Sequence, residues 1–177
     1  MYTPVGIELP EYYEWVRGTA YPKVSPGKPH GRLQVEMAVI VHAWGRKRGT
    51  IATENDMNIR VADDDIRRYL PDIQFTSYER LDAHGVPDDV EIQDIAPDLV
   101  IEILSPQQNH AYFEEKIRAF LVAGTTVVLV VDPDREAFIV YRADSQNVLA
   151  RGDRFDDPVF PGLVIDVAAV FDTLTRR

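Results

Sequence analysis

The sequence predicts an α/β (α+β) fold in which a mixed β-sheet is flanked by a few helices. Apolar residues recur at helical spacing over 30–44 and over 110–123, and apolar runs of strand length lie at 99–104 and 127–131. This order of helix, several strands, helix and further strands is typical of a sheet covered by helices. Because 177 residues suffice for one compact domain, we expect residues 1–177 to form a single domain.

The N-terminal half is expected to start with an irregular lead and a short hairpin, together spanning residues 1–28. The hairpin runs from Tyr13 to Tyr21 and turns at Gly18. The connection that follows should be kept extended by Pro22, Pro26 and Pro29. The helix over 30–44 has one apolar stripe and ends at Gly45. Short strands are expected around residues 50–53, 57–61 and 73–76, and a solvated loop over 82–94.

The C-terminal half is expected to alternate strand, helix and hairpin. The run over 99–104 predicts a strand, and the helix over 110–123 is expected to lie between an N-cap at Asn109 and a stop at Gly124. The segments 127–131 and 137–141 flank a turn and predict a hairpin. A short helix around 167–174 ends the chain.

The composition excludes several classes of site. The chain has no cysteine, which excludes disulfides, thiolate zinc sites and thiol nucleophiles, and this fits a cytoplasmic protein. No apolar run approaches the roughly 18 residues that span a bilayer, so we expect a soluble protein without a membrane partner. The four histidines show no zinc-ligand spacing, and there is neither a Gly-rich phosphate loop nor a Gly-x-Ser-x-Gly elbow.

The charge balance argues against nucleic-acid binding without excluding it. Nineteen Lys and Arg residues against 29 Asp and Glu residues give a net charge of −10, whereas phosphate neutralisation drives most nucleic-acid binding. Many of the acidic residues gather in segments 63–65 and 82–94, and basic residues cluster at Arg46–Arg48. If the protein binds nucleic acid, we expect Lys28, Arg46–Arg48 and Arg118 to line the approach to its site.

Glu102 is the most informative residue of the sequence. Val100, Glu102 and Leu104 share one face of the predicted strand, and both of its faces are otherwise apolar. A buried carboxylate without a partner is costly, so Glu102 requires a metal ion, a lysine or an arginine beside it. From the residues alone, a structural ion pair explains Glu102 as well as a catalytic site does.

Asp72 is a second candidate acid. It precedes a strand whose Ile73 and Phe75 are expected to face inward, so that Asp72 and Gln74 share the opposite face. An isolated Pro-Asp pair is more often a turn than a metal ligand, and Pro97-Asp98 repeats the pair in this chain. Asp72 therefore becomes informative only together with other residues.

Lys116 is selected by helical geometry. It lies at the border of the apolar stripe of its helix, so its ammonium group can reach the sheet surface that carries Glu102. The alternative is a lysine that only covers apolar surface. Glu36 has the same relation to the stripe of its own helix. Two carboxylates from adjacent strands can hold Mg²⁺, which activates water, and a nearby lysine can stabilise the charge of the transition state.

Several segments together carry a family resemblance. They are Pro71-Asp-Ile-Gln-Phe75, Ala96-Pro-Asp-Leu-Val-Ile-Glu-Ile-Leu-Ser-Pro106, Glu115-Lys116, Val130-Val-Asp-Pro133 and Phe160-Pro-Gly-Leu163. With the opening Tyr13-Glu-Trp-Val-Arg-Gly18, they resemble the Uma-two family, a large bacterial family of restriction endonucleases within the PD-(D/E)XK superfamily. The block over 96–106 is the specific part of the match, which covers nearly the whole chain.

The resemblance implies a restriction-endonuclease-like core and a set of site residues. Matching positions suggest Asp72 and Glu102 as ligands of Mg²⁺ or Mn²⁺, and Lys116 as the catalytic lysine. The superfamily's lysine normally stands two residues after the second acid, where this chain has Leu104, so the helix would supply it. His30 and Glu36 are candidates for outer-shell contacts. Family members often carry an acidic residue where this chain has Tyr112.

Two functions from different classes follow from these residues. The first is a metal-dependent endodeoxyribonuclease that hydrolyses phosphodiester bonds of DNA in the cytoplasm, and the resemblance leaves open assembly as a homodimer. The alternative is a catalytically silent binding or regulatory domain that retains the nuclease fold. The acid, acid, lysine set favours the nuclease, whereas the net charge and Tyr112 favour the silent domain.

Overall fold

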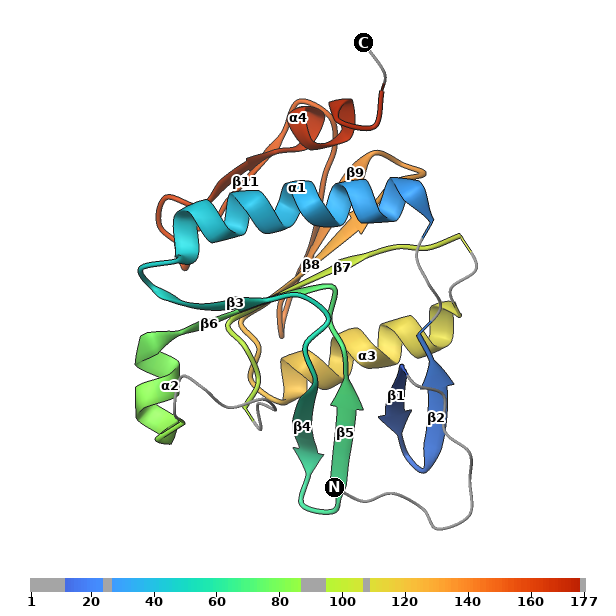
Figure 1. Cartoon of the computed structure of the whole chain (residues 1–177), viewed down its shortest axis with the longest axis vertical. Helices are drawn as coiled ribbons and strands as arrows, with labels where there is room; N and C mark the ends of the chain where they lie inside the picture. Colours follow the sequence, from blue (N-terminus) through green and yellow to red (C-terminus); the bar gives the residue numbers. More distant parts are fainter. Residues whose placement is uncertain (1–11, 24–26, 87–94, 107–108, 176–177) are drawn as a thin grey trace.

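A six-stranded mixed sheet forms the centre of the computed structural model, which describes residues 12–23, 27–86, 95–106 and 109–175 (Figure 1). The strand order is β10-β9-β8-β7-β6-β3. Only β7 and β8 are parallel, and the other neighbours are antiparallel. The strands of this sheet are β3 (Gly49–Ala52), β6 (Ile73–Ser77), β7 (Leu99–Ile103), β8 (Val127–Asp132), β9 (Ala137–Tyr141) and β10 (Gln146–Leu149).

Two helices cover the two faces of this sheet. On one face, Leu33, Met37 and Val41 of α1 (Lys28–Gly45) pack on the alternate residues of β7, together with α4 (Val167–Asp172). On the other face lies α3 (His110–Val122), whose Phe113, Ile117 and Phe120 contact the remaining strand residues. Figure 1 shows α1 and α3 on opposite sides of the central strands. The helix α3 is also the crossover that parallel strands β7 and β8 require.

A second, four-stranded sheet lies on the side of α3 (Figure 1). Its order is β2-β1-β5-β4, and its inward residues Val16, Met57, Ile59 and Tyr69 join the core beneath α3. The hairpin β1–β2 turns through Arg17 and Gly18, both with positive φ, the two-residue turn that matches the twist of the strands. The strands of this sheet are β1 (Tyr13–Val16), β2 (Thr19–Pro22), β4 (Met57–Ala62) and β5 (Asp65–Tyr69).

The remaining elements are short. The helix α2 (Tyr78–His84) is capped by Ser77 and ends at Gly85 in the left-handed region. The two-stranded ribbon of β11 (Arg154–Asp156) and β12 (Val164–Asp166) leads into α4. No helix in the described part of the chain is long and apolar enough to cross a membrane.

The observed elements confirm the main expectations and correct three of them. The hairpin around Gly18, both long helices and the six strands predicted within 50–141 are all present. Pro29, expected to keep the chain extended, instead lies in the first turn of α1, where a missing N–H costs nothing. The first residues of the expected loop over 82–94 belong to α2, and residues 87–94 lie outside the described part. The strands β5, β10, β11 and β12 were not predicted.

Candidate active site

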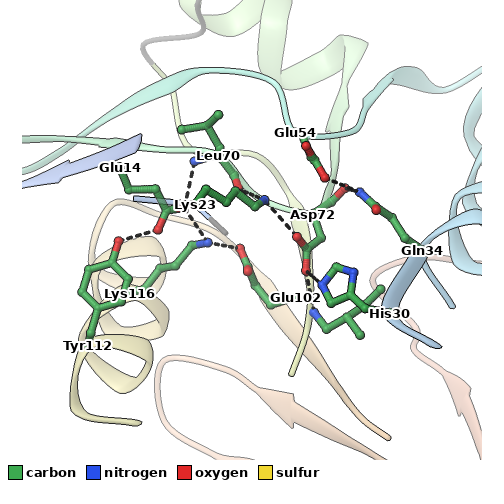
Figure 2. Close-up of polar contacts among 11 residues, drawn as sticks. Glu14, Lys23, His30, Gln34, Glu54, Leu70, Asp72, Glu102, Tyr112 and Lys116 are labelled. Atoms are coloured by element: carbon green, nitrogen blue, oxygen red, sulfur yellow. Dashed lines mark hydrogen bonds and ion pairs between the residues drawn. The ribbon is translucent and has the colours of Figure 1, made fainter. Parts of the chain in front are cut away.

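Asp72 and Glu102 are brought together by the pairing of β6 with β7. In this antiparallel pair Gln74 lies opposite Val100 and Ile73 opposite Ile101, so one further step places Asp72 opposite Glu102. Directly opposite residues on one face have Cβ atoms roughly 5 Å apart. The main-chain N–H of Ile103 donates to Oδ2 of Asp72 at 2.8 Å, which ties the two strand ends together. Both carboxylates are buried and point toward the same group of polar side chains (Figure 2).

The carboxylate of Asp72 is surrounded by donors. Its Oδ1 accepts a hydrogen bond from Nζ of Lys23 at 2.9 Å, and its Oδ2 also contacts Nε2 of His30 at 3.1 Å. Burial raises the pKa of Asp72, but the hydrogen bond of His30 and the charge of Lys23 outweigh burial and leave this pKa below its ordinary value. Asp72 is therefore an anion throughout the neutral range.

Glu102 and Lys116 form a buried ion pair beside Asp72. The distance from Nζ of Lys116 to Oε1 of Glu102 is 2.6 Å, although this oxygen accepts no well-oriented hydrogen bond from the described residues. Burial raises the pKa of Glu102 to about 8, against the effect of the neighbouring Lys116 charge. Burial alone would lower the pKa of Lys116, but the charges of Glu102 and Glu14 outweigh it and raise that pKa. Lys116 thus stays charged, and the pKa of Glu102 lies above its ordinary value.

A third carboxylate, that of Glu14 on β1, contacts the same lysine. Its Oε1 lies 2.8 Å from Nζ of Lys116 and accepts a hydrogen bond from the main-chain N–H of Leu70 at 3.0 Å. Its Oε2 accepts a hydrogen bond from the hydroxyl of Tyr112. Tyr112 therefore serves as a hydrogen-bond donor to Glu14, an acid that comes from a different element, β1 (Figure 2).

The carboxylates of this cluster outnumber its ammonium groups. Three carboxylates, Asp72, Glu102 and Glu14, face two ammonium groups, Lys23 and Lys116. One carboxylate is in excess over the ammonium groups, which agrees with the direction in which burial shifts the pKa of Glu102, upward. A cation bound near Glu102 would supply positive charge in place of a proton on that group.

The structure brings four of the five predicted site residues together and separates the fifth. Asp72, Glu102, Lys116 and His30 meet in the cluster. Glu36, predicted as an outer-shell contact, instead lines a surface hollow of about 510 Å³ with Lys28, Gly31, Arg32, Val35 and Thr173. The reason is helical phase: His30 lies near the site, and Glu36, six residues later, points about 120° away.

Three residues of the site were not predicted as members of it. Gln34, one turn after His30, donates to the main-chain oxygen of Asp72 at 3.1 Å. Glu14 shares a strand face with buried Val16, a pattern that would have identified a second buried carboxylate in the manner of Glu102. Lys23 carries no such signal, because it follows β2 and reaches Asp72 only through the fold.

The prediction that the largest basic cluster, Arg46–Arg48, lines the approach to the site is wrong. Arg46–Arg48 follows the C-terminal end of α1, whereas His30 lies near its start. At 1.5 Å per residue these positions are roughly 24 Å apart along the helix. Arg48 contacts the ring of Trp44, which belongs to that same end. The basic residues at the site are Lys23 and Lys116.

The residues of the cluster that could hold a metal ion are the carboxylates Asp72 and Glu102. No group of three or more His, Cys, Asp or Glu side chains in the described part of the chain is arranged to hold a metal. Mg²⁺ is commonly held by one or two carboxylates together with waters and substrate phosphates, and Asp72 and Glu102 are the carboxylates that could serve in this way. Lys23 on Oδ1 of Asp72 shows that this oxygen accepts a cationic partner.

Comparisons with known proteins identify the fold and the family of this chain. No curated protein matches the chain. The crystal structure of a putative nuclease belonging to DUF820 from Anabaena variabilis ATCC 29413 is similar, with a TM-score of 0.81 and 24% sequence identity over 96% of this chain and 95% of that one. The fold is thus restriction-endonuclease-like. The model of the Uma2 family, described as "Putative restriction endonuclease", matches residues 7–168, and the chain therefore belongs to the Uma2 (Uma-two) family.

Proposed function

We propose that this protein is a metal-dependent endodeoxyribonuclease of the PD-(D/E)XK type. The observation that carries the proposal is the meeting of Asp72, Glu102 and Lys116 in one buried cluster, in which carboxylates outnumber ammonium groups. A divalent cation would offset the excess of carboxylates in this cluster. The family match supports a nuclease, and DNA is the substrate of a restriction endonuclease.

Each residue has a role that its contacts support. Asp72 and Glu102 would hold Mg²⁺ or Mn²⁺, which when bound polarises a phosphate oxygen and lowers the pKa of a water molecule. Asp72 is kept ionised and oriented by His30 and the N–H of Ile103. Lys116 would stabilise the negative charge that develops on the phosphate in the transition state. Lys23 would leave Asp72 when a cation arrives and is then free to contact the phosphate backbone.

A second function, the silent binding or regulatory domain, is favoured by one observation. Both oxygens of Asp72 already have donors, and both ammonium groups already have carboxylate partners. A cluster of this kind can be a structural feature of the fold alone. Metal binding separates the two functions, because only the nuclease requires it.

The experiment that tests the proposal is incubation of the purified protein with supercoiled plasmid in Mg²⁺, in Mn²⁺ and in EDTA. We expect nicking or linearisation with either metal and none in EDTA. Asp72→Asn and Glu102→Gln should each abolish cleavage, and Lys116→Met should reduce it to a small residual rate. Glu36→Gln is the matched control, since it removes one acid on the side of α1 away from the cluster and should leave cleavage unchanged. A wild-type protein that neither cleaves DNA nor binds Mn²⁺ would establish the silent domain instead.

A further inference from the structure

We infer that Glu14 is a positioning residue that holds the Lys116 ammonium group at the site, an inference that rests on the nuclease function proposed above. Glu14 lies on β1, in the second sheet, whereas Lys116 lies on α3 and Glu102 on β7. Its side chain is only 7% exposed and is directed into the cluster (Figure 2). A buried carboxylate of this kind needs several donors, and the structure supplies them.

The carboxylate of Glu14 is itself fixed. Oε1 accepts from the main-chain N–H of Leu70, two residues before Asp72, and Oε2 accepts from the hydroxyl of Tyr112. Tyr112 is in turn held by stacking on Tyr21 of β2, with ring centroids 4.2 Å apart. Burial raises the pKa of Tyr112, so its hydroxyl remains a donor. The carboxylate therefore cannot turn without losing one of these contacts.

Lys116 needs such a fixed partner. Its ammonium group lies 2.8 Å from Glu14 and 2.6 Å from Glu102. If Glu102 turns its oxygens toward a cation, its hold on the lysine weakens, and a lysine on a flexible four-carbon stem would move. Glu14 has no role in holding the cation, so its contact with Lys116 persists. A displacement of about 1 Å at a catalytic group can reduce the rate about 100-fold.

The competing explanation is that Glu14 only ties the hairpin and α3 to the segment of Leu70. In that case Glu14→Gln would lower stability, and its effect on the rate would be independent of Lys116. In a positioning role the effect must act through the lysine. Substitutions of residues that act as one unit lower the rate together no more than one of them does alone. Substitutions of independent residues multiply their effects on the rate.

The test uses four full-length proteins, wild type, Glu14→Gln, Lys116→Met and the double variant, with Glu115→Gln as control. Glu115 is a partly exposed acid on α3 that pairs with Arg17 and Arg67, so its replacement removes one negative charge away from Lys116. Plasmid cleavage in Mn²⁺ gives kcat and KM. A ¹H–¹⁵N spectrum of the lysine ammonium groups, recorded without metal, reports on Lys116 independently of activity, because its signal is identified by its loss in Lys116→Met.

We expect Glu14→Gln to lower kcat about 10- to 100-fold with KM within about twofold. The kcat of the double variant should match that of Lys116→Met. The ammonium signal of Lys116 should broaden or vanish in Glu14→Gln but persist in Glu115→Gln. An active wild type with unchanged kcat and an unchanged ammonium signal in Glu14→Gln overturns the inference while the nuclease function stands. A multiplicative loss of rate in the double variant also overturns it. A wild type that binds no Mn²⁺ and cuts no DNA overturns the nuclease function and the inference with it.

Discussion

Replacement of Glu102 by glutamine distinguishes a metal-binding carboxylate from a structural one. Burial raises the pKa of Glu102 from 4.5 to about 8. The folded protein therefore keeps a proton that the unfolded chain has already lost between these two values. Because stability falls with pH wherever the folded state binds more protons, this group makes the free energy of unfolding decrease as the pH rises from 4.5 to about 8.

The size of the effect follows from the same shift. One pKa unit corresponds to about 1.4 kcal/mol, so the raised pKa of Glu102 corresponds to roughly 2–5 kcal/mol once its coupling to Lys116 is allowed for. Glutamine has nearly the same shape and no charge. We therefore expect Glu102→Gln to abolish this pH dependence, to match wild type near pH 4.5 and to exceed it by about 2–5 kcal/mol near pH 9.

Urea unfolding from acid to alkaline pH, with and without Mn²⁺, measures both quantities. A ligand that binds only the folded protein stabilises it by about 2.7 kcal/mol at 100 times its dissociation constant. Mn²⁺ should stabilise wild type and the Glu36→Gln control in this way, increasingly as the pH approaches 8, because the cation must displace the proton of Glu102. It should not stabilise Glu102→Gln.

One result would refute this reasoning. If Glu102 serves only as the structural partner of Lys116, removing its charge leaves the lysine undercompensated, and breaking a buried pair costs about 3–5 kcal/mol. A loss of that size in Glu102→Gln at alkaline pH, with no response of wild type to Mn²⁺, would show that the carboxylate holds the fold together and binds no metal.

Three further substitutions test the competition for Asp72, a buried amide and a close backbone contact. Lys23→Met removes the cation that competes for Asp72. The Mn²⁺ dissociation constant measured by titration calorimetry should therefore fall about tenfold, which is about 1.4 kcal/mol. An unchanged dissociation constant would show that Lys23 does not compete with the metal. Gln74→Met replaces a buried amide whose two polar atoms lack partners among the described residues, and should raise the free energy of unfolding by about 1–3 kcal/mol, whereas a loss would show that the amide is satisfied. Gly49→Ala places a Cβ 2.1 Å from the carbonyl oxygen of Thr76 and should cost about 1–3 kcal/mol or more in thermal unfolding. Gly31→Ala, whose Cβ meets nothing within 4 Å, is its control and should be neutral or stabilising.

The sequence contained enough information to find the centre of the site. Glu102 interrupts an apolar run of strand length, and the period of two in a strand assigns its face without any knowledge of the fold. The helical period likewise placed Lys116 at the edge of a buried stripe, and the structure shows the ammonium group beside Glu102. These predictions succeeded because they depend on the local geometry of one element at a time.

The same reasoning failed where charges are buried in pairs. In β5, Arg67 is 2% exposed and Ile66 is 50% exposed, the reverse of what a polarity pattern assumes. Arg67 is buried because Asp65 on the same strand and Glu115 on α3 accept its hydrogen bonds. A pattern that places apolar residues inside cannot identify such a strand, because the compensating acid on α3 lies far away in the sequence.

The sequence by itself thus determined the fold class, the two long helices, the faces of β6 and β7, and the acids and lysine that face each other there. Only the tertiary structure decided which other charges complete the site. Glu14 and Lys23 come from a hairpin in the second sheet and reach Lys116 and Asp72 across separations that no local period encodes. A buried charge requires a partner, but any acid or base of the chain satisfies that requirement, and the packing of the two sheets around α3 selects these two.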